Sequence, residues 1–250
     1  MIQQSKDPAE PESDAFTELV ESSRRSNIRA DIPAATTRRP ISEQVANRFL
    51  AMIKSGNLRS GDRLPTEQQM TIAFGISRPP LREALKALTL SDDFIAGVNL
   101  LNNFGWHFEI NVNHTQMDIV RDFVPQISTP MILDHCGKPG IAEGALDQYR
   151  TDVAALSKHK NLWIKLSDLP VEAGKDWTEA DLRPYITATL EAFGPERTIF
   201  AGDYPICLAA TTMTGWVDLL DRAFADLGLS ETETRSIYRD NANRFYRLGL

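Results

Sequence analysis

Residues 131–135 read Met-Ile-Leu-Asp-His, three large apolar side chains followed directly by a carboxylate and an imidazole. A short apolar run that ends in polar residues is typical of a buried strand. Three other segments indicate strands: 107–112, which alternates polar and apolar residues, 162–167 and 198–203. Helical stretches lie around 142–157, 178–193, 214–227 and 231–246. Strands that alternate with helices predict βαβ units, and therefore an α/β fold with a parallel sheet.

Two polar residues that close these strands are candidates for catalysis. In parallel sheets, the groups just past the carboxyl ends of the strands line the site. Asp203 can act there as a general base on a water molecule, and His135 can polarise a carbonyl group or bind a metal. Each residue also fits a plainer role as a hydrogen-bonding group at a strand end.

The first part of the chain differs from the rest in charge. Residues 37–90 contain nine Lys and Arg against four Asp and Glu, a net charge of +5, whereas residues 91–250 carry 14 against 23, a net charge of −9. The whole chain has a net charge of −7, and its 42% hydrophobic content excludes collagen-like and wholly disordered chains. The basic segment indicates a nucleic-acid-binding module joined to an acidic one, although a solvated basic face has the same composition.

Residues 41–90 have the periodicity of three helices. The first carries an apolar stripe and ends at a glycine: Ile41, Val45, Phe49, Leu50, Ile53 and Gly56. The second begins at Thr66, where Gln69 completes a capping box, and ends at Gly75. The third begins at Ser77 and has an apolar and a basic stripe: Leu81, Leu85, Leu88 and Arg78, Arg82, Lys86. Two helices joined by a short Gly-containing turn predict a helix-turn-helix, with a plain helical bundle as the alternative.

Two motifs in this segment carry a family resemblance. GDRLPTE at 61–67 and SRPPLREAL at 77–85 resemble the DNA-binding domain of GntR-family bacterial transcription regulators, over residues 39–88. The resemblance implies that Arg63, Arg78 and Arg82 contact DNA and that Thr66 or Ser77 reaches a phosphate. The chain departs from that family in Pro79-Pro80, which lack the amides that Ser77 would cap. It also reads Thr-Leu-Ser-Asp-Asp at 89–93, where the family forms a basic wing.

The remainder resembles a second family. Its motifs are GWHFEINV, PMILDHCGKP, LWIKLSDL, LRPYITATLEAFGPERTIFAGDYPIC and DNANRFYRL. Together they are similar to the later part of the amidohydrolase-related lactonases, sugar-lactone and pyrone-dicarboxylate lactonases with distorted (β/α)8 barrels. The resemblance implies that Asp203 activates water and that His135 contacts substrate or metal. Asn111 and Tyr204 stand where the family has Gln and Trp, and we expect them to contact substrate; Asp168 stands where the family has Gly.

Part of that family's pattern is missing. A full barrel needs about 250 residues, so the roughly 160 residues here hold about five βα units. The first strand of the family, with its His-x-His pair, does not occur in the chain. The related family can use a divalent metal, but only part of the ligand set is present, so no metal or cofactor is predicted and catalysis by the chain alone is not expected.

These observations predict a mostly disordered leader over residues 1–36, a GntR-type helix-turn-helix without its wing over 37–90, and a truncated amidohydrolase-related TIM-barrel domain over 91–250. The favoured function is a DNA-binding transcription regulator whose lactonase-derived domain senses a sugar acid or lactone. The alternatives are a hydrolase of sugar lactones and an inactive fusion of two gene fragments.

We expect a cytoplasmic homo-oligomer with DNA and a sugar-acid or lactone ligand as partners. No apolar run approaches the roughly 18 residues of a membrane span, and no signal-peptide core is present. Cys136 and Cys207 lack CxxC spacing and are expected to be free thiols in a reducing compartment.

Overall fold

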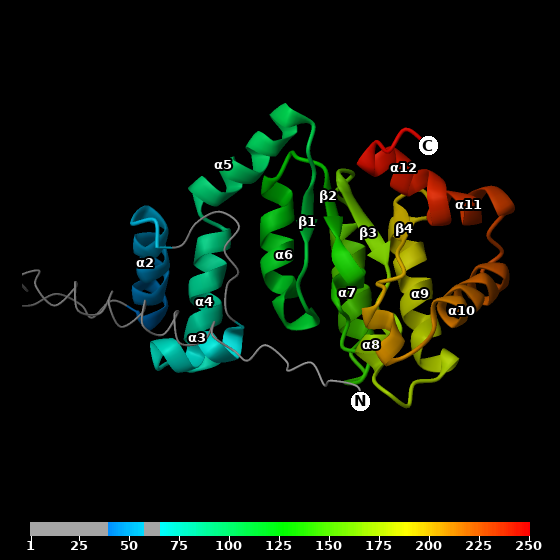
Figure 1. Cartoon of the computed structure of the whole chain (residues 1–250), viewed down its shortest axis with the longest axis horizontal. Helices are drawn as coiled ribbons and strands as arrows, with labels where there is room; N and C mark the ends of the chain where they lie inside the picture. Colours follow the sequence, from blue (N-terminus) through cyan, green and yellow to red (C-terminus); the bar gives the residue numbers. More distant parts are fainter. Residues whose placement is uncertain (1–39, 58–65) are drawn as a thin grey trace, which may run out of the picture. The chain divides into compact units, whose positions relative to one another are not determined.

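The computed structural model describes residues 40–57 and 66–250 (Figure 1). The chain divides into two compact units between Ser91 and Asp92, and each is described by itself. The predicted leader over residues 1–36 and the predicted DNA contact Arg63 lie outside the described residues. No helix in the described part of the chain is both long and apolar enough to span a membrane.

The first unit contains three helices, α2 (Ile41–Lys54), α3 (Glu67–Phe74) and α4 (Arg78–Thr89). Its core is made of nine buried side chains: Val45, Ala46, Phe49, Met52, Met70, Ala73, Phe74, Leu81 and Ala84. The stripe predicted for α2 is wrong at its ends, because Ile41 and Ile53 are each 53% exposed. Ile41 precedes every buried residue of α2, whereas Ile53 directly follows the buried Met52 and points about 100° away from it around the helix.

The turn between α3 and α4 follows the predicted chemistry. The amide of Gln69 donates to Thr66 Oγ1 (3.3 Å) and the amide of Thr66 donates to Gln69 Oε1 (2.9 Å), which confirms the capping box. Gly75 ends α3 in the left-handed region with φ of 65°, where glycine is favoured. Ser77 precedes α4 without accepting a capping hydrogen bond, because the following turn contains two prolines without amides.

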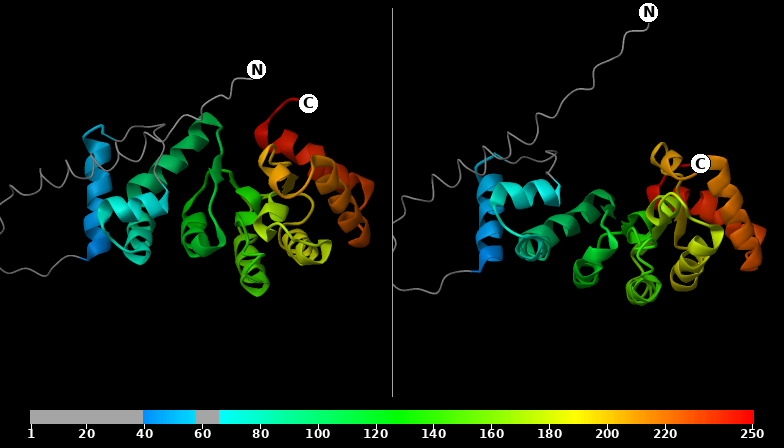
Figure 2. Two further views of the ribbon diagram at one scale, coloured as in Figure 1. Left: turned by 60° about the horizontal axis from the view of Figure 1, so that its bottom comes forward. Right: turned by 90° about the horizontal axis from the view of Figure 1, so that it is seen from below.

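The second unit is built on one sheet of four parallel strands in the order β1-β2-β3-β4. The strands are β1 (Phe108–Ile110), β2 (Met131–Leu133), β3 (Leu162–Leu166) and β4 (Thr198–Phe200). Successive strands are connected by α6 (Met117–Phe123), α7 (Leu146–Leu156) and α9 (Glu179–Phe193), which lie on one face of the sheet (Figures 1 and 2). The parallel α/β architecture is therefore confirmed.

The expectation of about five βα units is corrected to four strands among the described residues. Before β1 the second unit folds as α5 (Asp92–Leu100) and a 3₁₀ turn, and after β4 it is helical. The remaining elements are α8 (Leu169–Ala173), α10 (Met213–Asp226), α11 (Glu231–Arg235), a π-helical turn (Ser236–Asp240) and α12 (Asn241–Tyr246), with short 3₁₀ turns at 101–104, 114–116, 124–126, 134–137 and 206–209.

The C-terminal helices are anchored to the sheet by polar contacts. Asn241 is buried and donates to the carbonyl oxygens of Pro195 (2.6 Å) and Thr198 (2.7 Å), next to the start of β4. Tyr246 donates to Glu109 Oε1 on β1 (2.9 Å). These bonds join the last helix to two strands that are far from it in sequence.

Candidate functional site

Three ionisable side chains meet at the carboxyl edge of the sheet. His135 follows β2, Asp168 follows β3 and Asp203 follows β4, and one ligand atom of each lies within 4.8 Å of those of the other two. Because the strands are parallel and adjacent, their carboxyl ends open onto the same edge (Figure 1). The structure thus brings together the two predicted catalytic residues and adds a third that was not predicted.

The backbone around these residues is strained. Six non-glycine residues of the described chain have positive φ, and all but Arg247 lie at these strand ends: His135 (49°), Cys136 (54°), Lys138 (46°), Asp168 (65°) and Asp203 (49°). The left-handed region costs an L-residue roughly 1–2 kcal/mol. Such strain persists only where the surrounding fold imposes it, and it clusters at functional sites.

The His135 ring is held by its neighbours. Nδ1 lies 2.9 Å from Ser167 Oγ, which follows β3, and Nε2 lies 4.0 Å from Asp203 Oδ1 and 3.6 Å from Asp134 Oδ2. The bond to Ser167 restricts the ring's rotation and directs Nε2 toward the two carboxylates. The imidazole can therefore donate to, or accept from, a group bound between itself and Asp203.

Asp168 is the most buried carboxylate of this edge, with 3% of its side chain exposed. Its Oδ1 is buried and has no hydrogen-bond partner among the described residues, and Lys138 Nζ lies 4.0 Å from its Oδ2. Burial and the adjacent Asp203 carboxylate raise the pKa of Asp168 to about 7. The sequence signal for this residue was its position directly after a predicted strand, where the resembling family carries glycine.

An ion-pair network continues from the site across the sheet. Lys165 Nζ lies 2.9 Å from both Glu109 Oε2 and Asp134 Oδ1. Although burial opposes the charge, the hydrogen bonds to Asp134 and Glu109 raise the pKa of Lys165 above its usual range. Glu109 is partly buried, yet Lys165 and Tyr246 hold its pKa below the usual value. Sequence analysis missed this network because its members come from three separate strand regions.

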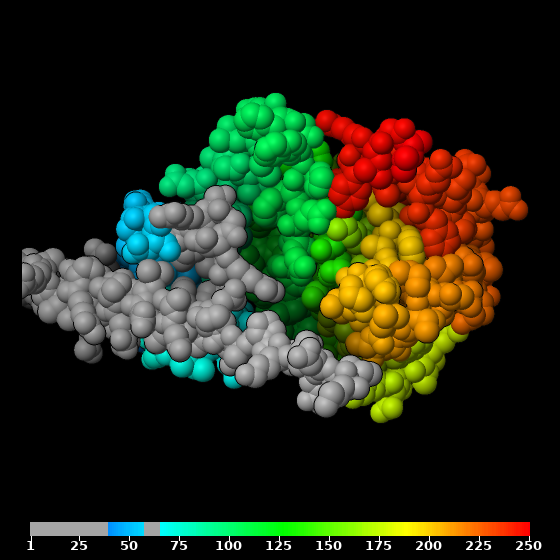
Figure 3. Space-filling model, viewed as in Figure 1, coloured from blue at the N-terminus to red at the C-terminus, as the bar shows by residue number. Residues whose placement is uncertain are grey.

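The predicted substrate contacts lie at the edge of this site. Asn111 follows β1 directly and is exposed. Tyr204 is next to Asp203 in the chain, and its side chain is 70% exposed. It belongs to the loop after β4, whose residues form part of the surface coloured yellow to orange in Figure 3. Both positions remain predictions as substrate contacts.

The predicted DNA contacts that the structure describes lie around α3 and α4. Thr66 and Ser77 are exposed residues that precede these helices, and Arg78 is the exposed first residue of α4. Arg82 is half-buried and forms an ion pair with Glu67, with Nε 3.4 Å from Oε2.

The two cysteines are buried free thiols. Cys136 Sγ donates to the carbonyl oxygen of Lys165 (3.3 Å), and burial raises the pKa of Cys136 to about 11. A thiol that stays protonated at neutral pH is a poor nucleophile. Cys136 therefore holds the loop after β2 against β3 and takes no part in the chemistry.

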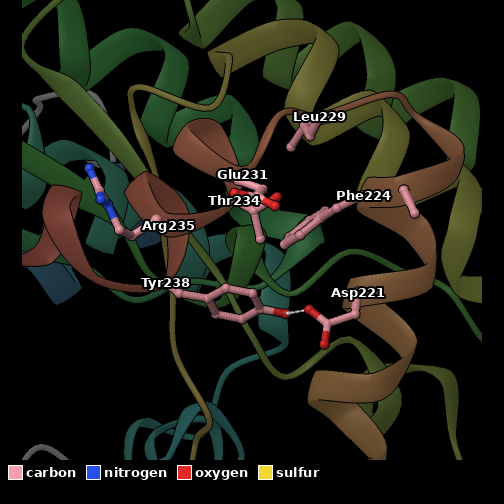
Figure 4. Close-up of a pocket in the computed structure, with 8 residues that line it drawn as sticks. Asp221, Phe224, Leu229, Glu231, Thr234, Arg235 and Tyr238 are labelled. Carbon is pink, nitrogen blue, oxygen red and sulfur yellow. Dashed lines mark hydrogen bonds between the residues drawn. The ribbon is translucent and has the colours of Figure 1, made fainter.

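A separate cavity of about 430 Å³ lies between α10 and the segment that begins with α11 (Figure 4). Tyr238 donates to Asp221 Oδ1 (2.8 Å) at one side of it, and Phe224 and Leu229 line its interior. This cavity contains none of the strand-end residues. Its hydrogen-bonded Tyr–Asp pair is already satisfied, so it offers little chemistry of its own.

Replacing Gly137 by Ala tests how tightly the strained loop is packed. Gly137 has φ of 73°, and a Cβ there would lie 2.9 Å from Met117 Sδ and 3.3 Å from Leu133 Cδ2. We expect Gly137→Ala to reduce the free energy of unfolding by about 1–3 kcal/mol, measured by urea denaturation. Gly144→Ala is the control, because φ is 69° but no atom lies within 4 Å. Equal losses in the two variants would show that only φ matters and that the loop is loosely packed.

The comparison with known proteins assigns one family to most of the chain, including residues of both compact units. The family model for amidohydrolases matches residues 28–248. An L-fucono-1,5-lactonase of Burkholderia multivorans is 32% identical over 177 residues, which cover 66% of this chain and 59% of the lactonase. The chain thus spans little more than half the length of that relative.

Two other similarities are informative. The crystal structure of an amidohydrolase from Burkholderia multivorans, with bound zinc, superposes with a TM-score of 0.63 and 26% identity, covering 93% of this chain and 80% of that one. The uncharacterized HTH-type transcriptional regulator YcbG of Bacillus subtilis is 45% identical over 51 residues, which cover 20% of this chain and 22% of the regulator.

Proposed function

Because the chain belongs to the amidohydrolase family, we propose that its second unit carries a hydrolytic site for lactones. The observation that supports this most directly is the juxtaposition of His135 Nε2 and Asp203 Oδ1 at 4.0 Å. A water oxygen can lie about 2.8 Å from both of these atoms, which is an ordinary hydrogen-bond distance. A single water molecule therefore fits between a general base and an imidazole.

The reaction assigned to these residues is addition of water to an ester carbonyl. Asp203 takes one proton from the water molecule while the water oxygen bonds to the lactone carbonyl carbon. The C–O bond of the ring then breaks, and the proton returns to the departing alkoxide, which leaves a hydroxy acid. When no cation is bound, His135 Nε2 donates a hydrogen bond to the carbonyl oxygen as negative charge develops there.

A sugar lactone is the proposed substrate class. The relative with 32% identity carries the name L-fucono-1,5-lactonase, and the similarity covers 66% of this chain. Asn111 and Tyr204 are proposed to contact the hydroxyl groups of the sugar. A divalent cation, where one is bound, would polarise the carbonyl group as a Lewis acid.

We also propose that the second unit is part of a barrel. Its four parallel strands follow one another in chain order, as do the eight strands of a (β/α)8 barrel. The chain has no His-x-His pair, which the lactonase family carries on its first strand. Activity of this chain therefore depends on what Asp203, His135 and their neighbours supply.

The test is turnover of a panel of aldono-1,4- and 1,5-lactones by the purified full chain, followed through the acid released into weakly buffered indicator solution. We expect hydrolysis faster than in protein-free buffer, with a dependence on lactone concentration that saturates. Rates equal to those in buffer for every lactone would end the proposal.

A second function is proposed for residues 37–90, which we infer bind DNA as a helix-turn-helix. Three observations support this proposal: the capped α3, the left-handed Gly75 and the exposed Arg78 at the start of α4. In addition, the HTH-type regulator YcbG is 45% identical to this chain over 51 residues. A chain with both functions would be a regulator whose hydrolase-derived unit recognises a lactone or sugar acid.

Replacing Arg78 by Ala tests DNA binding. A side chain that contacts one phosphate contributes about one unit to the slope of log affinity against log salt concentration. We expect the wild type to bind a labelled 30-base-pair duplex in a fluorescence anisotropy titration, and Arg78→Ala to reduce that slope by about one. Lys54→Ala, which removes the same charge at the end of α2, is the control. An unchanged slope for Arg78→Ala, or no binding by the wild type, would contradict the assignment.

A further inference from the structure

The backbone conformation and the burial at position 168 both disfavour a carboxylate side chain. The backbone of Asp168 is left-handed, with φ of 65°, at a position where the resembling lactonase family carries glycine. Its side chain is 3% exposed, and its Oδ1 is buried with no hydrogen-bond partner among the described residues. A residue that adds backbone strain and an unsatisfied buried oxygen requires a compensating interaction.

The surroundings suggest what that interaction is. Asp168 faces a second carboxylate, Asp203, and the imidazole of His135, with ligand atoms of all three within 4.8 Å of one another. Lys138 Nζ, 4.0 Å from Asp168 Oδ2, offers one positive charge to the two carboxylates. Asp134 Oδ2 also lies 3.6 Å from His135 Nε2, but the charge of this carboxylate is paired with Lys165, whose Nζ lies 2.9 Å from Oδ1.

We propose that Asp168 completes, with His135 and Asp203, a three-ligand site for one divalent cation. Bonds of about 2.0–2.2 Å to nitrogen and oxygen place ligand atoms at most about 4.4 Å apart across an ion. The 4.0 Å between His135 Nε2 and Asp203 Oδ1 is within this span. The ligand atoms of all three residues lie within 4.8 Å of one another, so no pair exceeds this span by more than about 0.4 Å.

The neighbouring groups support metal binding by His135. Ser167 Oγ lies 2.9 Å from Nδ1, so a proton on Nδ1 is held by the hydroxyl and the lone pair of Nε2 is left for the ion. A second hydrogen bond of this kind is usual for metal-binding histidines, because it sets both tautomer and ring orientation. The residue that orients the ring comes from the same loop as Asp168.

The donor set selects the class of ion. One imidazole nitrogen with two carboxylate oxygens suits Zn²⁺, Co²⁺ or Mn²⁺, whereas Ca²⁺ prefers six to eight oxygen ligands. Three protein ligands leave at least one position for water or for a substrate oxygen, which is the arrangement of catalytic sites and not of structural ones. The cation is thus placed where the proposed lactone carbonyl would lie.

The experiment measures metal binding directly and uses no substrate. Tag-free, chelator-treated full chain is titrated with ZnCl₂ in a calorimeter, and with CoCl₂ while its visible absorption is recorded. We expect one ion per chain and no cobalt–thiolate charge-transfer band, because both thiols are buried. Asp168→Gly restores the residue of the related family and relieves the positive φ, so it is expected to fold while its affinity falls at least tenfold.

Asp168→Asn tests the charge with the size unchanged, and we expect the same loss. Glu172→Gln is the matched control, because Glu172 is a nearby carboxylate outside the three-residue cluster and should bind the ion like the wild type. No binding by the wild type, or equal affinity in wild type and Asp168→Gly, would overturn the inference. Metal binding without lactone turnover would leave this site standing and remove only the proposed hydrolysis.

Discussion

Asp203→Asn is expected to lower the rate of lactone hydrolysis by about 10²–10⁴-fold, the contribution of a general base. Asparagine has the same shape but cannot take a proton from water, so the addition step loses its acceptor. Asparagine also tolerates the left-handed backbone, with φ of 49°, that this position requires. The variant also removes the repulsion between the adjacent carboxylates of Asp203 and Asp168. For both reasons we expect the variant to fold.

The measurement is kcat/KM for the lactone that the wild type hydrolyses fastest, together with the melting temperature. Asp147→Asn provides the control, because the Asp147 side chain is fully exposed at the start of α7 and does not belong to the cluster at the strand ends. A loss of rate with unchanged melting temperature supports the general-base role. Wild-type rates in Asp203→Asn would show that another group activates the water.

Leu81→Ala is expected to unfold most of the first unit. Leu81 is fully buried in the core between α2, α3 and α4. Truncation of a buried leucine costs about 2–5 kcal/mol. A unit of this size buries too little apolar surface to have much more stability than that. The helical signal of the first unit should therefore melt at a much lower urea concentration than in the wild type.

The chain offers a way to observe the two units separately. All four tryptophans, Trp106, Trp163, Trp177 and Trp216, lie in the second unit. Tryptophan fluorescence thus follows that unit alone, whereas far-ultraviolet circular dichroism follows the helices of both. For Leu81→Ala we expect an early dichroism transition and an unchanged fluorescence midpoint.

Ile53→Ala is the control for this experiment, because it removes a side chain of the same composition from a position that is 53% exposed. We expect a change within about 0.5 kcal/mol. Equal effects of the two substitutions would contradict the core described for the first unit. A fluorescence transition that shifts with the dichroism would contradict independent unfolding of the two units.

Local patterns predicted the elements well. The apolar run 131–133 coincides with β2 at both ends. The predicted helix at 178–193 corresponds to α9, for which Thr178 is the N-cap. The capping box at Thr66 and the left-handed Gly75 also follow from residues within a few positions of one another. Such features depend on the chain's own neighbours, so the sequence displays them directly.

The site was predicted only in part. His135 and Asp203 were found because each follows an apolar strand, and strand ends collect functional groups. Asp168 was noted as a departure from the family pattern but not as a site residue, because its burial and its missing partner are properties of the folded chain. The pairing of Arg82 with Glu67 was equally invisible, since it depends on how α3 and α4 meet.

The sequence alone therefore determined the strands, the residues that follow them and most of the helices, because periodicity and capping act over a few residues. It did not predict α5, α6 or α8. The tertiary structure decided which of those residues meet. Strand order places Asp168 beside Asp203, and register places Lys165 between Glu109 and Asp134. These contacts join segments that are tens of residues apart in the sequence. Only the packing of the whole sheet sets the distances between these side chains, and therefore how strongly their charges interact.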